Sequence, residues 1–157
     1  MQEEKKEHEK AEGKTRILVV DDHAIVREGL TLLINQEPDL HVCAEAENAE
    51  EALDAIAKEQ VDLAIVDISL EGTNGVELTE KIKSKCPHLP VLILTMHDEA
   101  SYAKRAFQAG AGGYITKHEA AETIITGIRL MLSGKEYVSE TMTQKILEKL
   151  RTETNHH

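Results

Sequence analysis

Short apolar runs alternate with amphipathic stretches along this chain, and this alternation constrains the fold more than any other feature. Five apolar runs of strand length begin near residues 16, 41, 61, 90 and 113. Between them apolar residues recur at helical spacing, as Val26, Leu30, Leu33 and Ile34 do after the first run. Because strands that are apolar along their whole length need cover on both faces, the pattern predicts a parallel sheet between two layers of helices.

The predicted unit is (βα)5, an α/β fold. Right-handed crossover connections leave few topologies for such a chain, and we expect the doubly wound, flavodoxin-like sheet order 2-1-3-4-5. The globular domain should span residues 15–135. Residues 1–14 alternate Glu and Lys with little to bury, which predicts a flexible leader. Residues 136–157 are expected to form a linker helix and tail, with the helix from about Glu140 to Arg151 and Ser139 as its N-cap.

Charge and hydropathy exclude several classes of function. The formal net charge of -11 argues against direct contact with nucleic-acid phosphates by this segment. No apolar run approaches the roughly 20 residues that a membrane-spanning helix requires. The first residues lack the apolar core of a secretory signal. We therefore expect a cytoplasmic protein without a membrane partner. Cys43 and Cys86 stand alone in the sequence, which is typical of structural thiols.

Polar residues stand where four of the five predicted strands end. In an open parallel sheet, ligands bind at the carboxyl ends of the strands, near the switch point between the first and third strands. A single aspartate there would usually be a helix cap or a loop residue. Agreement across four strands predicts one shared site, formed by Asp21, Asp22, Asp67, Thr95 and Lys117.

The residue types predict phosphoryl chemistry at this site. Clustered carboxylates repel one another unless a hard cation lies among them, and Mg²⁺ prefers a few carboxylate oxygens with waters and a phosphate oxygen. Asp67, on the central third strand, is the predicted nucleophile that forms an acyl phosphate. Asp22 would bind the metal directly, and Asp21 directly or through water. The Lys117 ammonium and the Thr95 hydroxyl would stabilise the transferring phosphoryl group.

Four motifs make a resemblance specific. VVDDH at 19–23, the D-I-S-L-x-G-x-x-G pattern at 67–75, LTMHDE at 94–99 and GAGGYITK at 110–117 resemble receiver domains of the NarL/FixJ (LuxR-type) group of two-component response regulators. The resemblance covers about residues 16–135. All signature positions of the family are occupied.

The resemblance implies a role for each matching residue. A histidine kinase would phosphorylate Asp67. Thr95 and Lys117 would contact the phosphoryl group, and Tyr114 would be the aromatic switch residue that turns inward as Thr95 shifts toward the phosphate. Magnesium would be held by oxygen ligands from two strand ends: Asp21, Asp22, Asp67 and the backbone carbonyl of Ser69.

Three histidines near the motifs have less specific interpretations. Many receivers carry proline after the conserved lysine, often in a cis peptide, whereas His118 follows Lys117 here. The NarL/FixJ group often lacks this proline, and a cis bond to a non-proline residue costs about 3–4 kcal/mol, so we expect none. His23 is expected in the loop that enters the first helix. His97 lies beside the site, and we do not expect it to be catalytic.

The implied function is a switch that controls transcription through a helix-turn-helix output domain, with DNA contacted only by that domain. No such domain follows the predicted linker. Either the chain was cut there, which the final pair His156–His157 favours, or the protein is a stand-alone receiver. Homodimers are expected through the fifth strand and fifth helix, or through the first and fifth helices.

Two alternatives remain for comparison. A pseudo-receiver would act only as a protein-interaction module, and an altered Asp67, Thr95 or Lys117 would indicate it; none is altered. An enzyme on the same fold is the other alternative. A haloacid-type phosphatase would need aspartate where Ser69 stands, and no GxxxxGK[ST] loop for nucleotides is present. The chain is therefore not expected to be a conventional enzyme, beyond catalysing its own phosphoryl transfer and dephosphorylation.

Overall fold

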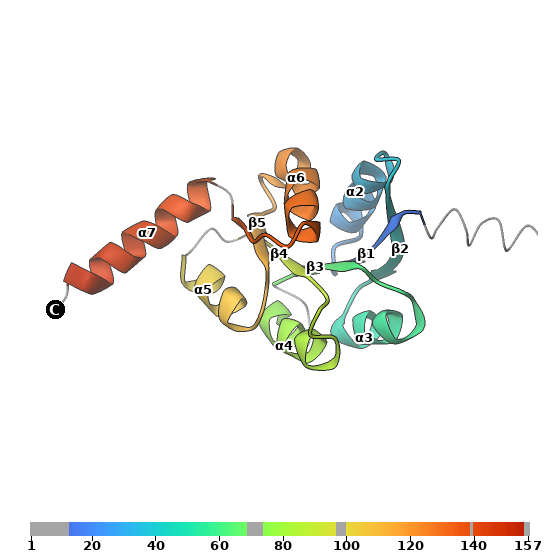
Figure 1. The fold of residues 1–157 in the computed structure, drawn as a ribbon, viewed down its shortest axis with the longest axis horizontal. Coiled ribbons are helices and arrows are strands. Elements are labelled where there is room, and N and C mark those ends of the chain that lie inside the picture. Colours follow the sequence, from blue (N-terminus) through green and yellow to red (C-terminus); the bar gives the residue numbers. More distant parts are fainter. Residues whose placement is uncertain (1–12, 69–73, 97–99, 139, 156–157) are drawn as a thin grey trace, which may run out of the picture.

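A parallel sheet with helices on both faces forms the body of the molecule. The computed structural model describes residues 13–68, 74–96, 100–138 and 140–155 (Figure 1). The strands lie in the order β2-β1-β3-β4-β5-β6, and every pairing is parallel. The strands are β1 (Thr15–Val20), β2 (Leu40–Ala46), β3 (Leu63–Asp67), β4 (Val91–Thr95), β5 (Gly113–Thr116) and β6 (Tyr137–Val138). The predicted order 2-1-3-4-5 is thus confirmed.

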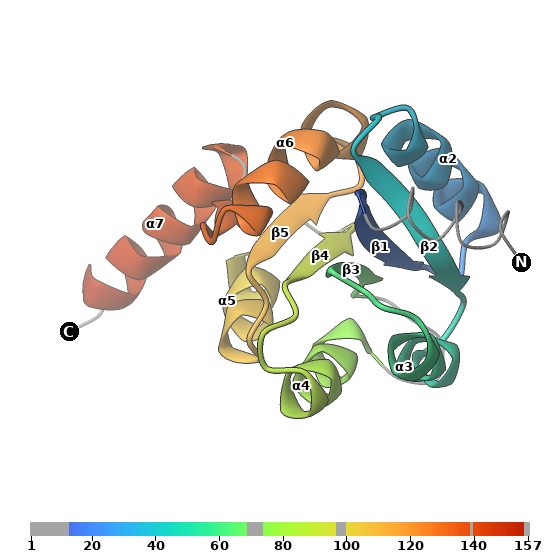
Figure 2. The ribbon, with the colours of Figure 1, turned by 45° about the vertical axis from the view of Figure 1, so that its right-hand side comes forward.

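The helices divide between the two faces of the sheet, as Figure 2 shows. Helices α3, α4 and α5 cover one face, and α2 and α6 cover the other. Alternate residues of β1 point to opposite sides: Leu18 and Val20 pack with the first group, while Ile17 and Val19 pack with the second. The helices are α2 (Ala24–Asn35), α3 (Ala49–Lys58), α4 (Gly75–Lys85), α5 (Ala100–Gln108), α6 (Ala120–Leu132) and α7 (Glu140–Asn155).

Asparagine caps start the two helices that follow β2 and β3. The Asn48 side chain accepts a hydrogen bond from the backbone N–H of Glu51 at 2.9 Å. Asn74 accepts one from Glu77 N at 2.8 Å. Each cap satisfies an N–H group that the first turn of a helix leaves without a partner. The second cap fixes the start of α4.

Two features lie at the carboxyl-terminal side of the fold. Strand β6 extends the sheet beyond the predicted five strands: Tyr137 N donates to Gly112 O at 2.9 Å. Helix α7 contacts α5 and runs away from the sheet in Figures 1 and 2. It ends at Asn155, past the predicted end at Arg151, and Ser139 lies outside the described residues. Among the described helices, none has the length and apolar content needed to cross a membrane.

Candidate functional site

The carboxyl edge of the sheet collects the side chains that the strand-end pattern selects. Asp67 and Thr95 are the last residues of β3 and β4, and Asp21 and Lys117 directly follow β1 and β5. Lys117 N donates to Thr95 O at 2.7 Å, so β5 delivers the lysine beside the end of β4. Because the strands are parallel and in register, their ends bring these residues to one place.

Asp21, Asp22 and Asp67 form a tight cluster with His23. Each of the four offers a ligand atom, and these atoms all lie within 4.8 Å of one another. Asp21 and Asp67 are completely buried. The Asp22 side chain is 22% exposed, so the cluster opens toward solvent on that side.

Lys117 is the cation of this site. Its Nζ lies 3.0 Å from Asp21 Oδ2 and 3.1 Å from Asp67 Oδ2, and its side chain is only 8% exposed. Burial alone would lower the pKa of Lys117, but the contacts and charges of Asp21 and Asp67 outweigh burial and raise this pKa. The lysine therefore stays protonated and neutralises one of the buried carboxylates.

The remaining negative charge fits a bound cation. Three carboxylates share one ammonium, and two side-chain oxygens, Asp21 Oδ2 and Asp22 Oδ1, are buried and accept no hydrogen bond from the described residues. Asp21 Oδ2 has the Lys117 ammonium as an ion-pair partner, but not in hydrogen-bonding geometry. Buried carboxylate oxygens without hydrogen bonds are costly unless a cation coordinates them. An oxygen-rich set of this kind suits Mg²⁺.

His23 is closer to the carboxylates than a loop residue needs to be. It is the N-cap of α2, as its expected place in the loop required, but its side chain makes no capping hydrogen bond. Its Nδ1 lies 3.0 Å from Asp21 Oδ1 and 3.0 Å from Asp22 Oδ1. Its backbone N–H also donates to Asp21 Oδ1 at 2.8 Å. Its position directly after the acidic pair was the only signal in the sequence.

Arg27 holds the backbone of Asp21 in place, and its role was not predicted from the sequence. Its Nη1 donates to the backbone carbonyl of Asp21 at 2.7 Å, and its Nε lies 3.2 Å from Glu45 Oε1. The bond to Asp21 fixes the turn that leads from β1 into α2. Its position on α2, one turn after His23, could have indicated such a contact.

Gly75 sets how closely α4 approaches the acceptor strand. Its N–H donates to Ile68 O at 2.9 Å. A Cβ atom at this position would lie 2.5 Å from the Asp67 carbonyl oxygen and 2.6 Å from Ile68 Cα, so only glycine fits. Ser69 and His97 lie outside the described residues.

The predicted switch residues are both buried. Thr95 ends β4, and Tyr114 in β5 pairs with Ile93 in register. The Tyr114 ring packs in the core on the side of α3, α4 and α5, so this structure holds it inward. The peptide bond between Lys117 and His118 is trans, as expected.

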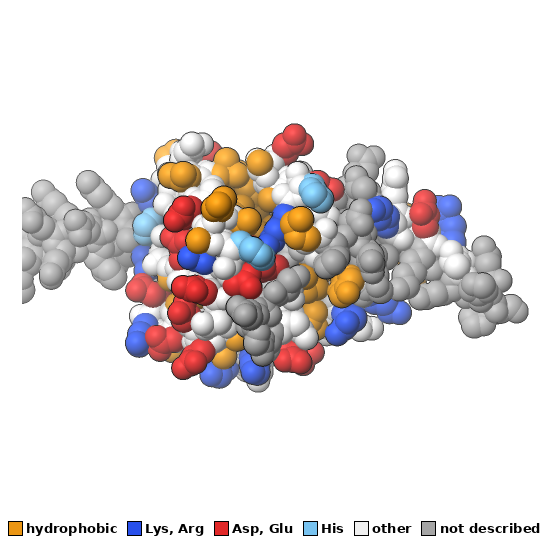
Figure 3. Space-filling model, turned by 180° about the vertical axis from the view of Figure 1, so that it is seen from behind, with side chains coloured by type: hydrophobic (Ala, Val, Ile, Leu, Met, Phe, Trp, Pro, Cys, Tyr) orange, Lys and Arg blue, Asp and Glu red, His pale blue; other side chains and the backbone are white. Residues whose placement is uncertain are grey.

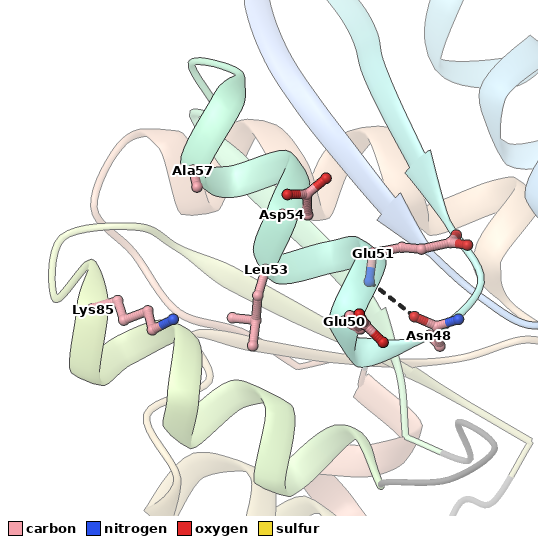
Figure 4. A pocket seen from close by; sticks show the side chains of 7 residues that line it. All are labelled: Asn48, Glu50, Glu51, Leu53, Asp54, Ala57 and Lys85. Carbon is pink, nitrogen blue, oxygen red and sulfur yellow. Dashed lines mark hydrogen bonds between the residues drawn. The ribbon is translucent and has the colours of Figure 1, made fainter.

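A separate hollow lies between α3 and α4. It has a volume of about 630 Å³, and none of the five strand-end residues lines it. Figure 4 shows its side chains, which are mostly polar: Asn48, Glu50, Glu51, Leu53, Asp54, Ala57 and Lys85. Lys58 pairs with Asp54, and Glu51 accepts from Glu47 N, so two of its three acidic side chains have partners. On the face of the body that Figure 3 shows, several acidic side chains also lie at the surface.

Comparison with known proteins gives the same family from three directions. The profile of the response regulator receiver domain matches residues 17–129. The transcriptional regulatory protein DegU of Brevibacillus brevis is 31% identical over 92% of this chain, and the oxygen regulatory protein NreC of Staphylococcus epidermidis is 34% identical over 84%. The crystal structure of a LuxR-family two-component response regulator from Aurantimonas sp. SI85-9A1 is 38% identical. Its superposition on this chain has a TM-score of 0.83 and covers 87% of this chain and 97% of the Aurantimonas chain.

The curated relatives are longer than this chain. Both DegU and NreC are matched over 61% of their own length. The profile match, the identity to these relatives and the shared sheet order agree with the resemblance found in the sequence motifs. The chain therefore belongs to the receiver domains of two-component response regulators, in the NarL/FixJ (LuxR-type) group.

Proposed function

We propose that this receiver is a phosphorylation switch that takes a phosphoryl group from a histidine kinase onto Asp67. The observation that carries the proposal is the placement of Lys117, whose ammonium lies 3.0 Å from Asp21 and 3.1 Å from Asp67 at the sheet edge. An Asp67 oxygen would attack phosphorus as the bond from phosphorus to the kinase histidine breaks, and the histidine nitrogen would keep the electron pair. Lys117 and the Thr95 hydroxyl would then hold the phosphoryl oxygens.

Asp21, Asp22, Asp67 and the Ser69 backbone carbonyl would hold Mg²⁺. The bound ion supplies positive charge that offsets the charge on the transferring group. Asp21 Oδ2 and Asp22 Oδ1 are buried and accept no hydrogen bond from the described residues, which supports this assignment. Asp22 is the partly exposed member of the set and so lies on the entry side.

The conformational output would run through Thr95 and Tyr114. Thr95 would move toward the phosphoryl group, and Tyr114 would occupy the inward position that it has in this structure. In the cytoplasm, this change would control transcription through an output domain that alone contacts DNA. We also propose that residues 15–135 form the receiver domain and that residues 136–157 form the linker helix and tail. The name of the relative DegU, a transcriptional regulatory protein, supports it.

A homodimer is the proposed assembly, and α2 with α6 is the better supported of the two expected faces. Ile25 and Leu32 lie two turns apart on α2 and are 85% and 69% exposed. Leu132 at the end of α6 is also exposed. The other expected face, β5 with α6, offers no comparable pair among the described side chains.

Intact mass spectrometry tests the acceptor. Incubation with Mg²⁺ and phosphoramidate should add one phosphoryl group that hydroxylamine removes, as it does from acyl phosphates. Asp67→Ala should take up none, whereas Asp54→Ala, an exposed carboxylate on α3, should behave as wild type. A phosphoryl group that persists in Asp67→Ala would contradict the assignment. A wild-type chain that takes up none would favour the pseudo-receiver alternative.

The coupling residue has its own test. Thr95→Ala should still be phosphorylated, because Asp67 and Lys117 remain, but the dimerisation that follows phosphorylation should weaken. Sedimentation of phosphorylated wild type and variant measures this difference. Equal dimerisation in the two proteins would remove Thr95 from the switch.

A further inference from the structure

We infer that His23 is a nitrogen ligand of the cation at the acidic cluster, and that it makes this site prefer metals such as Co²⁺ and Mn²⁺ over Mg²⁺. The inference rests on the proposed cation site and adds to it a ligand and a metal preference. His23 belongs to no part of the proposed phosphoryl transfer. Its imidazole therefore needs an explanation of its own.

The distances match the edges of a coordination shell. Ligand atoms about 2.1 Å from an octahedral metal lie about 3.0 Å apart when they are adjacent. His23 Nδ1 lies 3.0 Å from Asp21 Oδ1 and 3.0 Å from Asp22 Oδ1. It lies 3.9 Å from Asp67 Oδ2, between the adjacent spacing and the opposite spacing of about 4.2 Å. One nitrogen thus faces all three carboxylates.

A hydrogen bond at 3.0 Å accounts for the contact of His23 Nδ1 with Asp21 Oδ1, but not for its equal distance to Asp22 Oδ1. A neutral ring carries one proton and can give it to only one good acceptor. Asp21 Oδ1 already accepts the backbone N–H of His23 at 2.8 Å. Asp22 Oδ1 and the completely buried Asp21 Oδ2 accept no hydrogen bond from the described residues, although Lys117 forms an ion pair with Asp21 Oδ2. These oxygens point to a cation that the ring nitrogen would share with them.

The ligand set determines which metal ions bind more tightly. Mg²⁺ prefers oxygen ligands and keeps several waters, so it gains little from an imidazole. First-row transition metals bind imidazole well, and their affinity rises along the series from Mn²⁺ to Cu²⁺. The His23 side chain is 59% exposed, so the ring can keep its proton on Nε2 in water while Nδ1 binds the metal. Three carboxylates with one imidazole therefore favour Co²⁺ and Mn²⁺ over Mg²⁺.

The test compares metal affinity in the full, unphosphorylated chain. Calorimetric titration should show His23→Ala and His23→Gln binding Co²⁺ at least about tenfold more weakly than wild type. Their affinity for Mg²⁺ should change by less than about threefold. His118→Ala is the matched control, because this exposed histidine follows Lys117 but lies outside the cluster. To remove tail binding, all variants carry alanine at 156 and 157.

A spectroscopic readout separates a ligand from a neighbour. Pulsed electron paramagnetic resonance of bound Mn²⁺ should show coupling to one directly bound ¹⁴N nucleus in wild type and His118→Ala, and none in His23→Gln. Wild-type Mn²⁺ without this coupling, or equal weakening of Co²⁺ and Mg²⁺ by His23→Ala, would overturn the inference while phosphorylation of Asp67 could still stand. If no divalent cation binds the wild-type cluster, both this inference and the proposed magnesium site fail.

Discussion

The two edges of the parallel sheet handle charge in opposite ways. At the amino edge, the guanidinium of Arg16, at the start of β1, lies 2.7 Å from Glu59. Arg129, near the end of α6, reaches Asp39 with two nitrogens, at 2.6 and 3.0 Å, and Glu37 at 2.8 Å. These charges lie at the surface or close to it, and each has a partner of opposite sign.

The carboxyl edge buries its charges and leaves them incompletely paired. Asp21 and Asp67 are completely buried and share the single ammonium of Lys117. Asp22 Oδ1 is also shielded from water and accepts no hydrogen bond from the described residues. An arrangement of this kind costs stability that hydrophobic side chains of similar size would not cost.

The difference separates charges that stabilise the fold from charges that serve function. Paired surface charges add little to stability and can be removed at small cost. Buried charges without full partners persist where function needs them, since sites for chemistry and binding commonly trade stability for reactivity. The comparison therefore predicts large, cation-dependent effects at the carboxyl edge and small, salt-dependent effects at the amino edge.

Lys117→Met should have the largest effect. It leaves Asp21 and Asp67 buried without their ammonium, and loss of one partner of a buried pair costs about 3–5 kcal/mol. Urea unfolding in EDTA measures the loss, and added Mg²⁺ should recover much of it by supplying positive charge at the same place.

The double variant Lys117→Met with Asp67→Asn is the control, because removing one carboxylate should restore part of the stability without any metal. The predicted contrast between the two edges would be contradicted if Lys117→Met in EDTA were as stable as wild type. It would also be contradicted if Mg²⁺ stabilised wild type and Lys117→Met equally.

Gly75→Ala should have the next largest effect. Its new methyl group would meet the Asp67 carbonyl oxygen at 2.5 Å, and overpacking of this kind typically costs about 1–3 kcal/mol. Gly29→Ala is the matched control, since a methyl group there has no neighbour within 4 Å. Alanine in a helix should stabilise α2 by about 0.5–1 kcal/mol.

Phosphoryl uptake should fall in Gly75→Ala and stay unchanged in Gly29→Ala, because only the first substitution shifts Asp67. Changes of the same sign in the two free energies of unfolding would mean that α4 moves away from β3 without cost. The acceptor edge would then be less rigid than the packing indicates.

The sheet was predictable because its strands are long enough to carry a pattern. β1, β3 and β4 are apolar along nearly their whole length, and polar residues stand at the ends of β3 and β4 and directly after β1. This pattern indicates the number of strands and the edge at which a site forms. β6 has only two residues, Tyr137 and Val138, too few for any periodicity. Its existence depends on pairing with β5, which only the folded chain supplies.

The site was predictable only to the level of backbone position. Strand ends located Asp21, Asp67 and Lys117 at one edge, and the structure places them there in contact. That Lys117 divides its contacts between two carboxylates, and that the His23 ring turns toward them, depends on side-chain torsions. No spacing in the sequence encodes these torsions.

Arg129→Gln should have the smallest effect, and it sharpens the comparison from the amino edge. The substitution removes ion pairs whose side chains are 43% exposed on Arg129 and 56% on Asp39, so solvent and salt screen them. The urea midpoint should fall by less than in Gly75→Ala. The difference from wild type should vanish at high salt and should not respond to Mg²⁺. A response to Mg²⁺ would mean that the two edges are coupled.

Lowering the pH should reduce the difference in stability between wild type and Arg129→Gln. The hydrogen bond from Arg129 lowers the pKa of Asp39 below its ordinary value. A carboxyl whose pKa is lower in the folded state than in the unfolded state stabilises the fold above the unfolded pKa, about 3.9, and loses this contribution as pH falls through the folded value. The gap between wild type and Arg129→Gln should therefore be constant from about pH 7 to about pH 5 and shrink below about pH 4. In an Asp39→Asn background the gap at neutral pH should be smaller, because Glu37 alone then remains beside Arg129. A gap that widened in acid would mean that a group other than Asp39 titrates. The contrast between solvent-screened charges at the amino edge and buried charges at the carboxyl edge would then not hold.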